Sequence, residues 1–268
     1  MLGTLLEKNN RMIVSKLDDV PEDMHFAGLT IGSFDGVHLG HQFLLKTLKA
    51  KLPPNSRIAV FTFANHPSHH FTPHSPTPLI CPPLQKAKLL ESYGADLVIL
   101  SHFTPELSRT PFDQFLRQLK EKLSFTHLVL GEGATFGKKR EGNEENIKQL
   151  APTLEFQVEY LPKFNLHDTA LSSGRVRELI AKGQLHDVHE CLGRSYSLMG
   201  KVETEDRFYI FNAEGLCLLP EGVYPVRIQP ASHSHLGRAQ VLSKEQKIRL
   251  ELLENQVLKN LNEVEVIF

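Results

Sequence analysis

Short apolar segments alternate with stretches of helical periodicity in the N-terminal part of the chain, and this alternation constrains the fold most. The clearest segment, RIAVFTF at 57–63, is rich in the β-branched and aromatic residues typical of a buried strand. Similar segments lie at 28–34, 96–100, 127–130 and 155–161. Strands that are separated by helices pair in parallel through right-handed crossovers. The alternation therefore predicts a Rossmann-like α/β domain with a parallel sheet.

Helix signals occupy the intervals between these segments. The pattern at 84–93 ends before Gly94, a residue common just after a helix. Thr110 is expected to cap a helix that runs to about Leu123, with Pro111 at its first position. Further helices are expected at 42–52, 143–150 and 172–183. Residues 64–83, rich in Pro, His, Ser and Thr, are expected to form a long loop.

The pattern changes in the last third of the sequence. Short β-like segments follow at 196–202, 208–211 and 223–228. The charged stretch 243–260 favours a C-terminal helix. We therefore expect two domains, 1–185 with the parallel sheet and 186–268 with a small β-barrel-like sheet followed by that helix.

Composition excludes several classes of protein. Of 268 residues, 23% are charged and the formal net charge is -1, so no bulk charge favours nucleic acid or an anionic membrane. Cys81, Cys191 and Cys217 form no CxxC pair, which argues against a zinc site or a disulfide framework. The start of the sequence does not resemble a signal peptide, and no apolar run approaches the roughly 20 residues that span a bilayer. We expect a cytoplasmic protein without nucleic-acid or membrane partners.

Three loops are candidates for a ligand site, because parallel sheets bind ligands beyond the carboxyl ends of their strands. They follow the first, second and fourth predicted strands, and they hold much of the glycine, histidine and basic content. Their sequences are GSFDGVHLGH at 32–41, ANHPSHH at 64–70 and GEGATFGKKREGN at 131–143. His69, His70 and His74 are expected to be solvated loop residues, and no protein metal site is expected.

The first loop has the chemistry of a phosphate site. His38 and His41 are three residues apart at a helix start, so they face one side of a helix N-terminus that attracts anions. Two imidazoles there would stabilise charge on a phosphoryl group. Gly32, Gly36 and Gly40 allow close backbone approach to a ligand. The Walker lysine pattern of P-loop ATPases does not occur. Asp35 either orders the loop or contacts magnesium-bound water, or it holds an Asx turn.

The H-x-G-H spacing after a first strand resembles the HxGH nucleotidyltransferases. The wider match, GSFDGVHLGHQFLL, looks like the first motif of bacterial FAD synthetases, the N-terminal module of bifunctional riboflavin kinase/FAD synthetases. This resemblance implies that His38 and His41 contact the ATP phosphates and stabilise the transition state. It also implies an ATP and phosphate site in the rest of this motif, at Gly32, Phe34, Asp35, Gly36 and Gly40.

Two further segments resemble the same family in its nucleotide and flavin loops. TFANHP at 62–67 resembles TFxPHP, with Asn65 in the place of a proline and with His66 and Pro67 matching. The segment from Phe136 resembles the end of the family's GxDFxFGxxRxG loop. The matching residues there are Phe136, Gly137 and Arg140, whereas Gly133 and Ala134 replace an acidic or amide residue and an aromatic one.

LSSGRVR at 171–177 resembles the family's ISSTxxR. By that resemblance Ser172 and Ser173 cap a helix that faces the ATP phosphates, and Arg177 supplies a catalytic charge. Gly174 replaces the family's threonine.

The resemblance weakens in the second domain. LGRSYSLMGKV at 192–202 looks like the entry to a riboflavin kinase barrel, but the family's PTAN segment does not occur in the sequence. We therefore expect a degenerate kinase-like domain that has lost riboflavin kinase activity.

Together these matches imply an FAD synthetase that uses ATP, Mg²⁺ and FMN and releases FAD and pyrophosphate. Two alternatives remain. One is a noncatalytic flavin- or nucleotide-binding protein derived from the enzyme, and the other is an HxGH nucleotidyltransferase with another phosphate acceptor. The sequence does not fix the oligomeric state.

Overall fold

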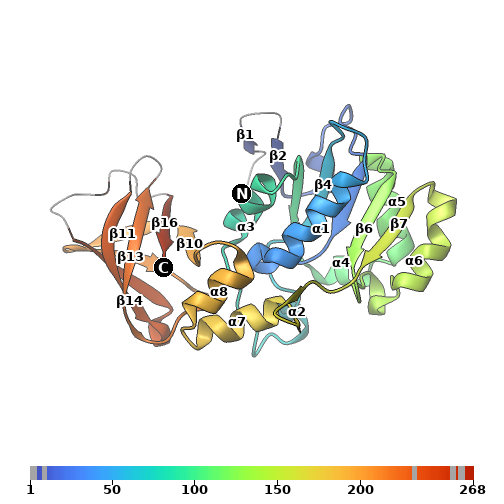
Figure 1. The fold of residues 1–268 in the computed structure, drawn as a ribbon. Coiled ribbons are helices and arrows are strands. Elements are labelled where there is room, and N and C mark those ends of the chain that lie inside the picture. The colour runs from blue at the N-terminus through green and yellow to red at the C-terminus, as the bar shows by residue number, and fades with distance from the viewer. Residues whose placement is uncertain (1–4, 8–10, 231–233, 254–257, 259–262) are drawn as a thin grey trace. The chain divides into compact units, whose positions relative to one another are not determined.

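The computed structural model describes residues 5–7, 11–230, 234–253, 258 and 263–268 (Figure 1). The chain forms two compact units. The first comprises Met1–Pro76 and Lys86–Ala170, and the second comprises Thr77–Gln85 and Leu171–Phe268. The expected functional division between residues 185 and 186 stays a prediction.

The first unit is built on a mixed seven-stranded sheet in the order β1-β2-β5-β4-β3-β6-β7. β1 pairs antiparallel with β2, and every other neighbouring pair is parallel. The five predicted strands are all confirmed, whereas β1 and β2 were not predicted. The strands are β1 (Leu5–Glu7), β2 (Arg11–Val14), β3 (Gly28–Ile31), β4 (Ile58–Phe63), β5 (Leu97–Ser101), β6 (His127–Gly131) and β7 (Gln157–Leu161).

Helices cover both faces of this sheet. On one face, alternate strand residues such as Leu29 and Ile31 share a core with the buried side of α5 (Phe112–Leu123), which includes Phe115 and Leu119. α1 (Leu39–Ala50) packs on β3 and β6. From β3 the chain proceeds outward through β4 and β5, and it then returns to β6 on the other side of β3. This doubly wound order confirms the predicted α/β class and places the switch point between β3 and β6.

The structure describes six further α-helices. They are α2 (Ser68–Phe71), α3 (Pro83–Ser92), α4 (Pro105–Arg109), α6 (Glu144–Leu150), α7 (Ser173–Ala181) and α8 (Leu185–Leu192). The predicted helices at 84–93, 143–150 and 172–183 correspond to α3, α6 and α7. Residues 64–83 form a loop as predicted, interrupted by α2 and entering α3 at its end.

The predicted helix start at Thr110 is wrong. Thr110 ends α4, where its hydroxyl donates to the Glu106 carbonyl at 3.1 Å, and α5 begins after Pro111 without a side-chain cap. Residues 104–111 contain two Thr-Pro pairs, and the threonine of the first pair is the one that caps a helix. Thr104 accepts from the N–H of Leu107 at 3.2 Å and starts α4.

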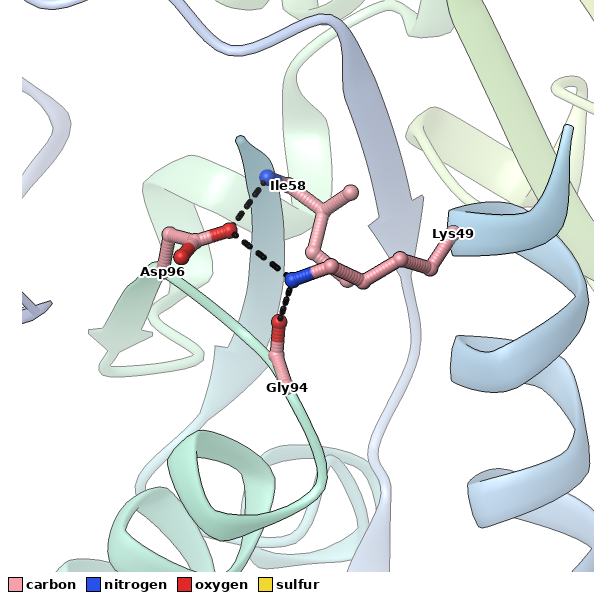
Figure 2. A network of polar contacts seen from close by, with 4 residues as sticks. All are labelled: Lys49, Ile58, Gly94 and Asp96. Carbon is pink, nitrogen blue, oxygen red and sulfur yellow. Dashed lines mark hydrogen bonds and ion pairs between the residues drawn. The ribbon is translucent and has the colours of Figure 1, made fainter. Parts of the chain in front are cut away.

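Figure 2 shows a polar network at the amino ends of β4 and β5. Asp96 accepts from the N–H of Ile58 at 2.9 Å and lies 3.8 Å from the ammonium of Lys49. Lys49 also donates to the carbonyl of Gly94 at 3.4 Å, and Gly94 ends α3 as predicted with φ +104°. The Lys49 side chain is 46% exposed, so its ion pair with Asp96 adds little stability. The hydrogen bond from the Ile58 N–H to Asp96 is the stronger contact. The network fixes the sheet edge opposite to the one where ligands are expected.

Tyr160 in β7 carries a buried hydroxyl beside the core of the first unit. Among the residues that the structure describes, this hydroxyl has no hydrogen-bond partner. Burial, with a smaller contribution from the charge of Glu144, raises the pKa of Tyr160 to about 12. The neutral phenol is therefore favoured in the folded state.

Replacing Tyr160 with phenylalanine is expected to leave the free energy of unfolding unchanged or to raise it by up to about 1 kcal/mol at pH 7, because an unsatisfied polar group is removed. The raised pKa means that wild-type stability is complete below pH 10 and falls as the pH rises through 10 to 12. In the variant that fall should be shallower. Urea unfolding of both proteins at pH 7, 9.5 and 11.5 measures both effects. A loss above 1 kcal/mol at pH 7 would show that the hydroxyl makes a needed contact.

The second unit contains a curled antiparallel half-barrel in the order β10-β16-β13-β14-β15-β12-β11. The barrel-like prediction is confirmed in this open form, and the three predicted segments correspond to β10, β12 and β13. The strands are β10 (Ser197–Gly200), β11 (Val202–Glu205), β12 (Phe208–Asn212), β13 (Gly222–Pro230), β14 (His235–Leu242), β15 (Lys247–Leu252) and β16 (Val264–Ile267). Helix α8 was not predicted.

The predicted helix at 243–260 is wrong where the structure describes it. Residues 247–252 form β15, which pairs with β12 and β14. Ile248 and Leu250 are buried, Lys247 before them is exposed and Arg249 between them is half-buried, so the segment follows the two-residue period of a strand. Its Lys, Glu and Leu content favours a helix, and the pairing with two neighbouring strands outweighs that propensity. Residues 243–245 form one 3-10 turn, and the predicted positions 254–257 and 259–260 lie outside the described residues.

Within the described residues, every helix is too short or too polar to cross a membrane.

Candidate functional site

The turn that follows β3 is strained and buried. Phe34 has φ +47°, Gly36 has φ +76° and Val37 has φ +41°. A β-branched residue such as valine rarely adopts this left-handed conformation, and such strain gathers at functional sites. Asp35 within the turn is only 1% exposed. Strain and burial together indicate that the turn does more than connect β3 to α1.

His38 and His41 form a stacked pair at the start of α1. His38 is the N-cap residue, and its carbonyl accepts from the N–H groups of His41 at 2.8 Å and Gln42 at 3.1 Å. The two imidazole rings lie 3.6 Å apart and 19° from parallel. The ring of Phe34 meets His41 edge-on at 5.1 Å. The structure thus places both predicted catalytic histidines together at a helix N-terminus, which favours anions.

The three glycines of the loop are explained by the packing of the loop itself. A Cβ at Gly40 would lie 3.2 Å from ring atoms of His38, and a Cβ at Gly32 would lie 3.0 Å from the ring of Phe34. Gly36 carries the positive φ of the turn. These positions hold the histidine pair in shape, and the predicted role of the glycines in approaching a ligand stays a prediction.

The loop after β4 orients His66 through neighbouring groups. Its Nδ1 accepts from the N–H of Ser68 at 3.1 Å and lies 2.8 Å from the Ser68 hydroxyl. Since Nδ1 is an acceptor, the neutral ring carries its proton on Nε2. Asn65 binds the backbone of Phe103 twice, accepting from its N–H at 2.8 Å and donating to its carbonyl at 3.2 Å. Asn65 therefore joins the loops after β4 and β5, and Pro67 precedes α2 as its N-cap.

The loop after β6 is closed by a pair of backbone hydrogen bonds. Phe136 and Gly142 exchange N–H and carbonyl contacts at 3.2 and 2.9 Å, and the ring of Phe136 packs edge-on against Phe115 at 5.8 Å. Gly137 has φ +75°. Arg140 is exposed at the tip of the loop, next to exposed Lys138 and Lys139. The loop therefore presents basic side chains from a rigid base.

Ser172, Ser173 and Arg177 belong to the second unit. Ser172 caps α7 as predicted, because its hydroxyl accepts from the N–H of Arg175 at 3.2 Å. The Nε of Arg177 donates to the Pro78 carbonyl at 2.8 Å, and the Arg177 carbonyl accepts from the Cys217 thiol at 3.6 Å. Arg177 thus helps to hold the segment before α3 within the second unit, and its catalytic role stays a prediction.

The other predicted residues gather at one edge of the first unit. The loops after β4, β3 and β6 leave the carboxyl ends of three adjacent parallel strands. Sequence reasoning missed one charged group at this edge, Lys86, which is 2% exposed on α3. The sequence did contain a sign of this burial. Lys86 is four residues before Leu90, so the two share the apolar face of the predicted helix.

Comparison with known proteins agrees with this geometry. The family model described as FAD synthetase matches residues 20–175, which is more than half of the chain. An FAD synthetase of Listeria monocytogenes is 28% identical over 210 residues, covering 76% of this chain and 85% of the relative. A bifunctional riboflavin kinase/FMN adenylyltransferase of Haemophilus influenzae is 33% identical over 176 residues, covering 65% of this chain and 57% of the relative.

A solved structure of a macrolide-efflux protein from Streptococcus pneumoniae has a TM-score of 0.77 to this chain, covering 95% of this chain and 88% of the other. At 20% identity this similarity concerns the fold alone. The range that the family model matches includes the histidine pair, the strained turn and the loops after β4 and β6. The chain belongs to the FAD synthetase family of nucleotidyltransferases.

Proposed function

We propose that the protein is an FMN adenylyltransferase. A phosphate oxygen of FMN attacks the α-phosphorus of ATP, the bond from that phosphorus to the bridging oxygen breaks, and pyrophosphate leaves. The products are FAD and pyrophosphate. No covalent intermediate with the protein is needed, so the protein's contribution is to position both substrates and to neutralise charge.

The stacked pair of His38 and His41 carries this proposal. The pair lies at the N-terminus of a twelve-residue helix and directly after the strand at the switch point. The partial positive charge at that point attracts phosphate, and imidazole N–H groups stabilise oxygens that gain charge during the transfer. His66 supports the same chemistry, since the proton on its Nε2 makes that atom a donor for an anion.

Aromatic rings beside the loop after β4 support a planar acceptor such as flavin. Phe71 is 64% exposed, and its ring lies 5.7 Å from that of Phe103. Phe103 in turn packs edge-on with Phe63 at 5.4 Å. An exposed ring on a fixed aromatic base is suited to stacking against an isoalloxazine ring.

Magnesium fits this site as a companion of ATP. Asp35 is the one carboxylate between residues 31 and 41, and it is buried in the turn. The ion would therefore be held mainly by phosphate oxygens and water, which is its usual mode in nucleotide sites. When bound it neutralises charge on the phosphates.

We further propose that the second unit has no riboflavin kinase activity. Where the resembling family carries its PTAN segment, residues 202–212 form a tight hairpin of β11 and β12 that turns at Asp206 and Arg207. Asn212 accepts from the N–H of Glu214 at 3.0 Å, so it stabilises the next turn. The hairpin therefore stands in the part of the sequence where the resembling family supplies a threonine and an asparagine to the nucleotide.

Assays with separate acceptors test both proposals. Purified protein with ATP and Mg²⁺ is expected to make FAD from FMN and to make no FMN from riboflavin, with products separated by chromatography. FMN formed from riboflavin would overturn the kinase proposal. No FAD from FMN, with ATP still bound in calorimetry, would support a noncatalytic binding protein or an enzyme with another phosphate acceptor.

A further inference from the structure

Lys86 is a buried lysine at the carboxyl edge of the parallel sheet. Its side chain is 2% exposed, and its ammonium donates to the carbonyls of Ser33 at 2.9 Å and Phe63 at 2.5 Å. Ser33 lies in the turn after β3, and Phe63 is the last residue of β4. One charged group from α3 therefore binds the ends of two neighbouring strands.

These contacts take over where the pairing of the two strands ends. The register of β3 and β4 extends to Ile31 opposite Phe61, followed by a hydrogen bond from the Gly32 N–H to the Phe61 carbonyl at 3.1 Å. Beyond that point the Ser33 carbonyl accepts from the hydroxyl of Thr62 at 2.9 Å and from Lys86. Side chains thus replace ladder bonds at the start of the loop that leads to the histidine pair.

A buried charge is expensive to retain unless its hydrogen bonds are made, and an apolar side chain of similar length would fill the space more cheaply. The charge is also placed among strand carbonyls, next to the turn where a phosphate is expected. Lys86 offsets the negative ends of these carbonyl dipoles and fixes the position of the Ser33 carbonyl.

We propose that Lys86 is a positioning residue for adenylyl transfer. It fixes the turn at 33–37 and, through that turn, the alignment of His38 and His41 with the phosphates. The proposal rests on the proposed function. Displacement of reacting groups by about 1 Å lowers rates by about 10²-fold, so loss of this anchor should act on kcat more than on KM.

The test compares Lys86→Met with a matched variant, Lys120→Met. Lys120 also donates to two backbone carbonyls, those of Phe125 at 2.7 Å and Glu155 at 3.2 Å, but these precede β6 and β7 at the opposite edge of the sheet. Lys86→Met is expected to lower kcat about 30- to 100-fold with KM for ATP changed less than threefold. Lys120→Met is expected to keep kcat within about twofold.

A second variant covers the case in which Lys86→Met fails to fold. Thr62→Val removes the neutral hydrogen bond to the same Ser33 carbonyl at a fully buried position. It is expected to lower kcat about three- to tenfold, in the same direction as Lys86→Met. An unchanged kcat in a folded Thr62→Val protein would count against positioning through Ser33.

Amide hydrogen exchange separates this proposal from the proposed function, because it needs no turnover. Residues 33–42 are expected to exchange faster in Lys86→Met than in wild type, and at the wild-type rate in Lys120→Met. Wild-type protein without FAD synthesis would refute the function while exchange still tested the anchor. Equal effects of both lysine variants, or unchanged exchange and kcat in Lys86→Met, would overturn the positioning role.

Discussion

Replacing both His38 and His41 with alanine is expected to lower kcat for FAD formation by about 10³-fold or more. Removing one preorganised donor to a developing oxyanion typically lowers a rate by about 10²- to 10³-fold, and the stacked pair acts as a unit. ATP binding should weaken far less, about tenfold or below, because the helix N-terminus and the loops after β4 and β6 remain. Single-turnover kinetics and calorimetry with ATP measure the two effects separately.

His127→Ala supplies the matched control. His127 is the first residue of β6, so it lies at the amino ends of the parallel strands, whereas the histidine pair follows the carboxyl end of β3. Its ring lies 3.0 Å from the Thr126 hydroxyl. Its loss should leave kcat within about twofold. Retention of more than a tenth of wild-type kcat in the double variant would contradict the catalytic role of the pair. Complete loss of ATP binding would assign the histidines to binding and leave the transfer step unexplained.

The parallel sheet could be predicted because each of its central strands has a local sequence pattern typical of a buried strand. Segments 58–63 and 97–101 are predominantly apolar, with one hydroxyl residue each, and a helical pattern separates them. β1 and β2 lack that signal, since they are short and lie at one side of the sheet. In the second unit, β15 reads as a helix from its composition and becomes a strand through pairing with distant segments. The secondary-structure propensity of a short segment does not show which distant strands it will pair with.

The candidate site divides in the same way. The histidine pair is local, because a spacing of three residues after a strand fixes both rings on one helix turn. Lys86 and Asn65 act across the fold, on carbonyl and N–H groups 53, 23 and 38 residues away. A sequence shows which residues are polar, but it does not show which distant backbone groups they satisfy. The contacts of these two anchors therefore required the structure, whereas the candidate histidine pair could be predicted from the sequence.

Gly137→Ala is expected to lower kcat/KM for ATP by about 10²-fold. Gly137 has φ +75° and ψ +177°, a region open almost only to glycine. A Cβ there would lie 2.7 Å from backbone atoms of Phe112 at the start of α5. The loop would have to move away from that helix and break the hydrogen bond from the Lys138 N–H to the Thr110 carbonyl, now 2.8 Å. Because the proposed site draws on this loop, the nucleotide should bind less tightly.

Gly133→Ala separates this clash from the backbone conformation alone. Gly133 lies in the same loop with φ +76°, but a Cβ there would meet no atom within 4 Å. A positive φ costs a residue with a Cβ roughly 1–3 kcal/mol of stability in either variant, so both should show a lower Tm. Only Gly137→Ala should also lose most of kcat/KM. Equal losses in the two variants would mean that loop strain alone governs activity. Normal ATP binding in a folded Gly137→Ala protein would place the nucleotide away from this loop, and the basic residues at its tip would then be a solvated surface.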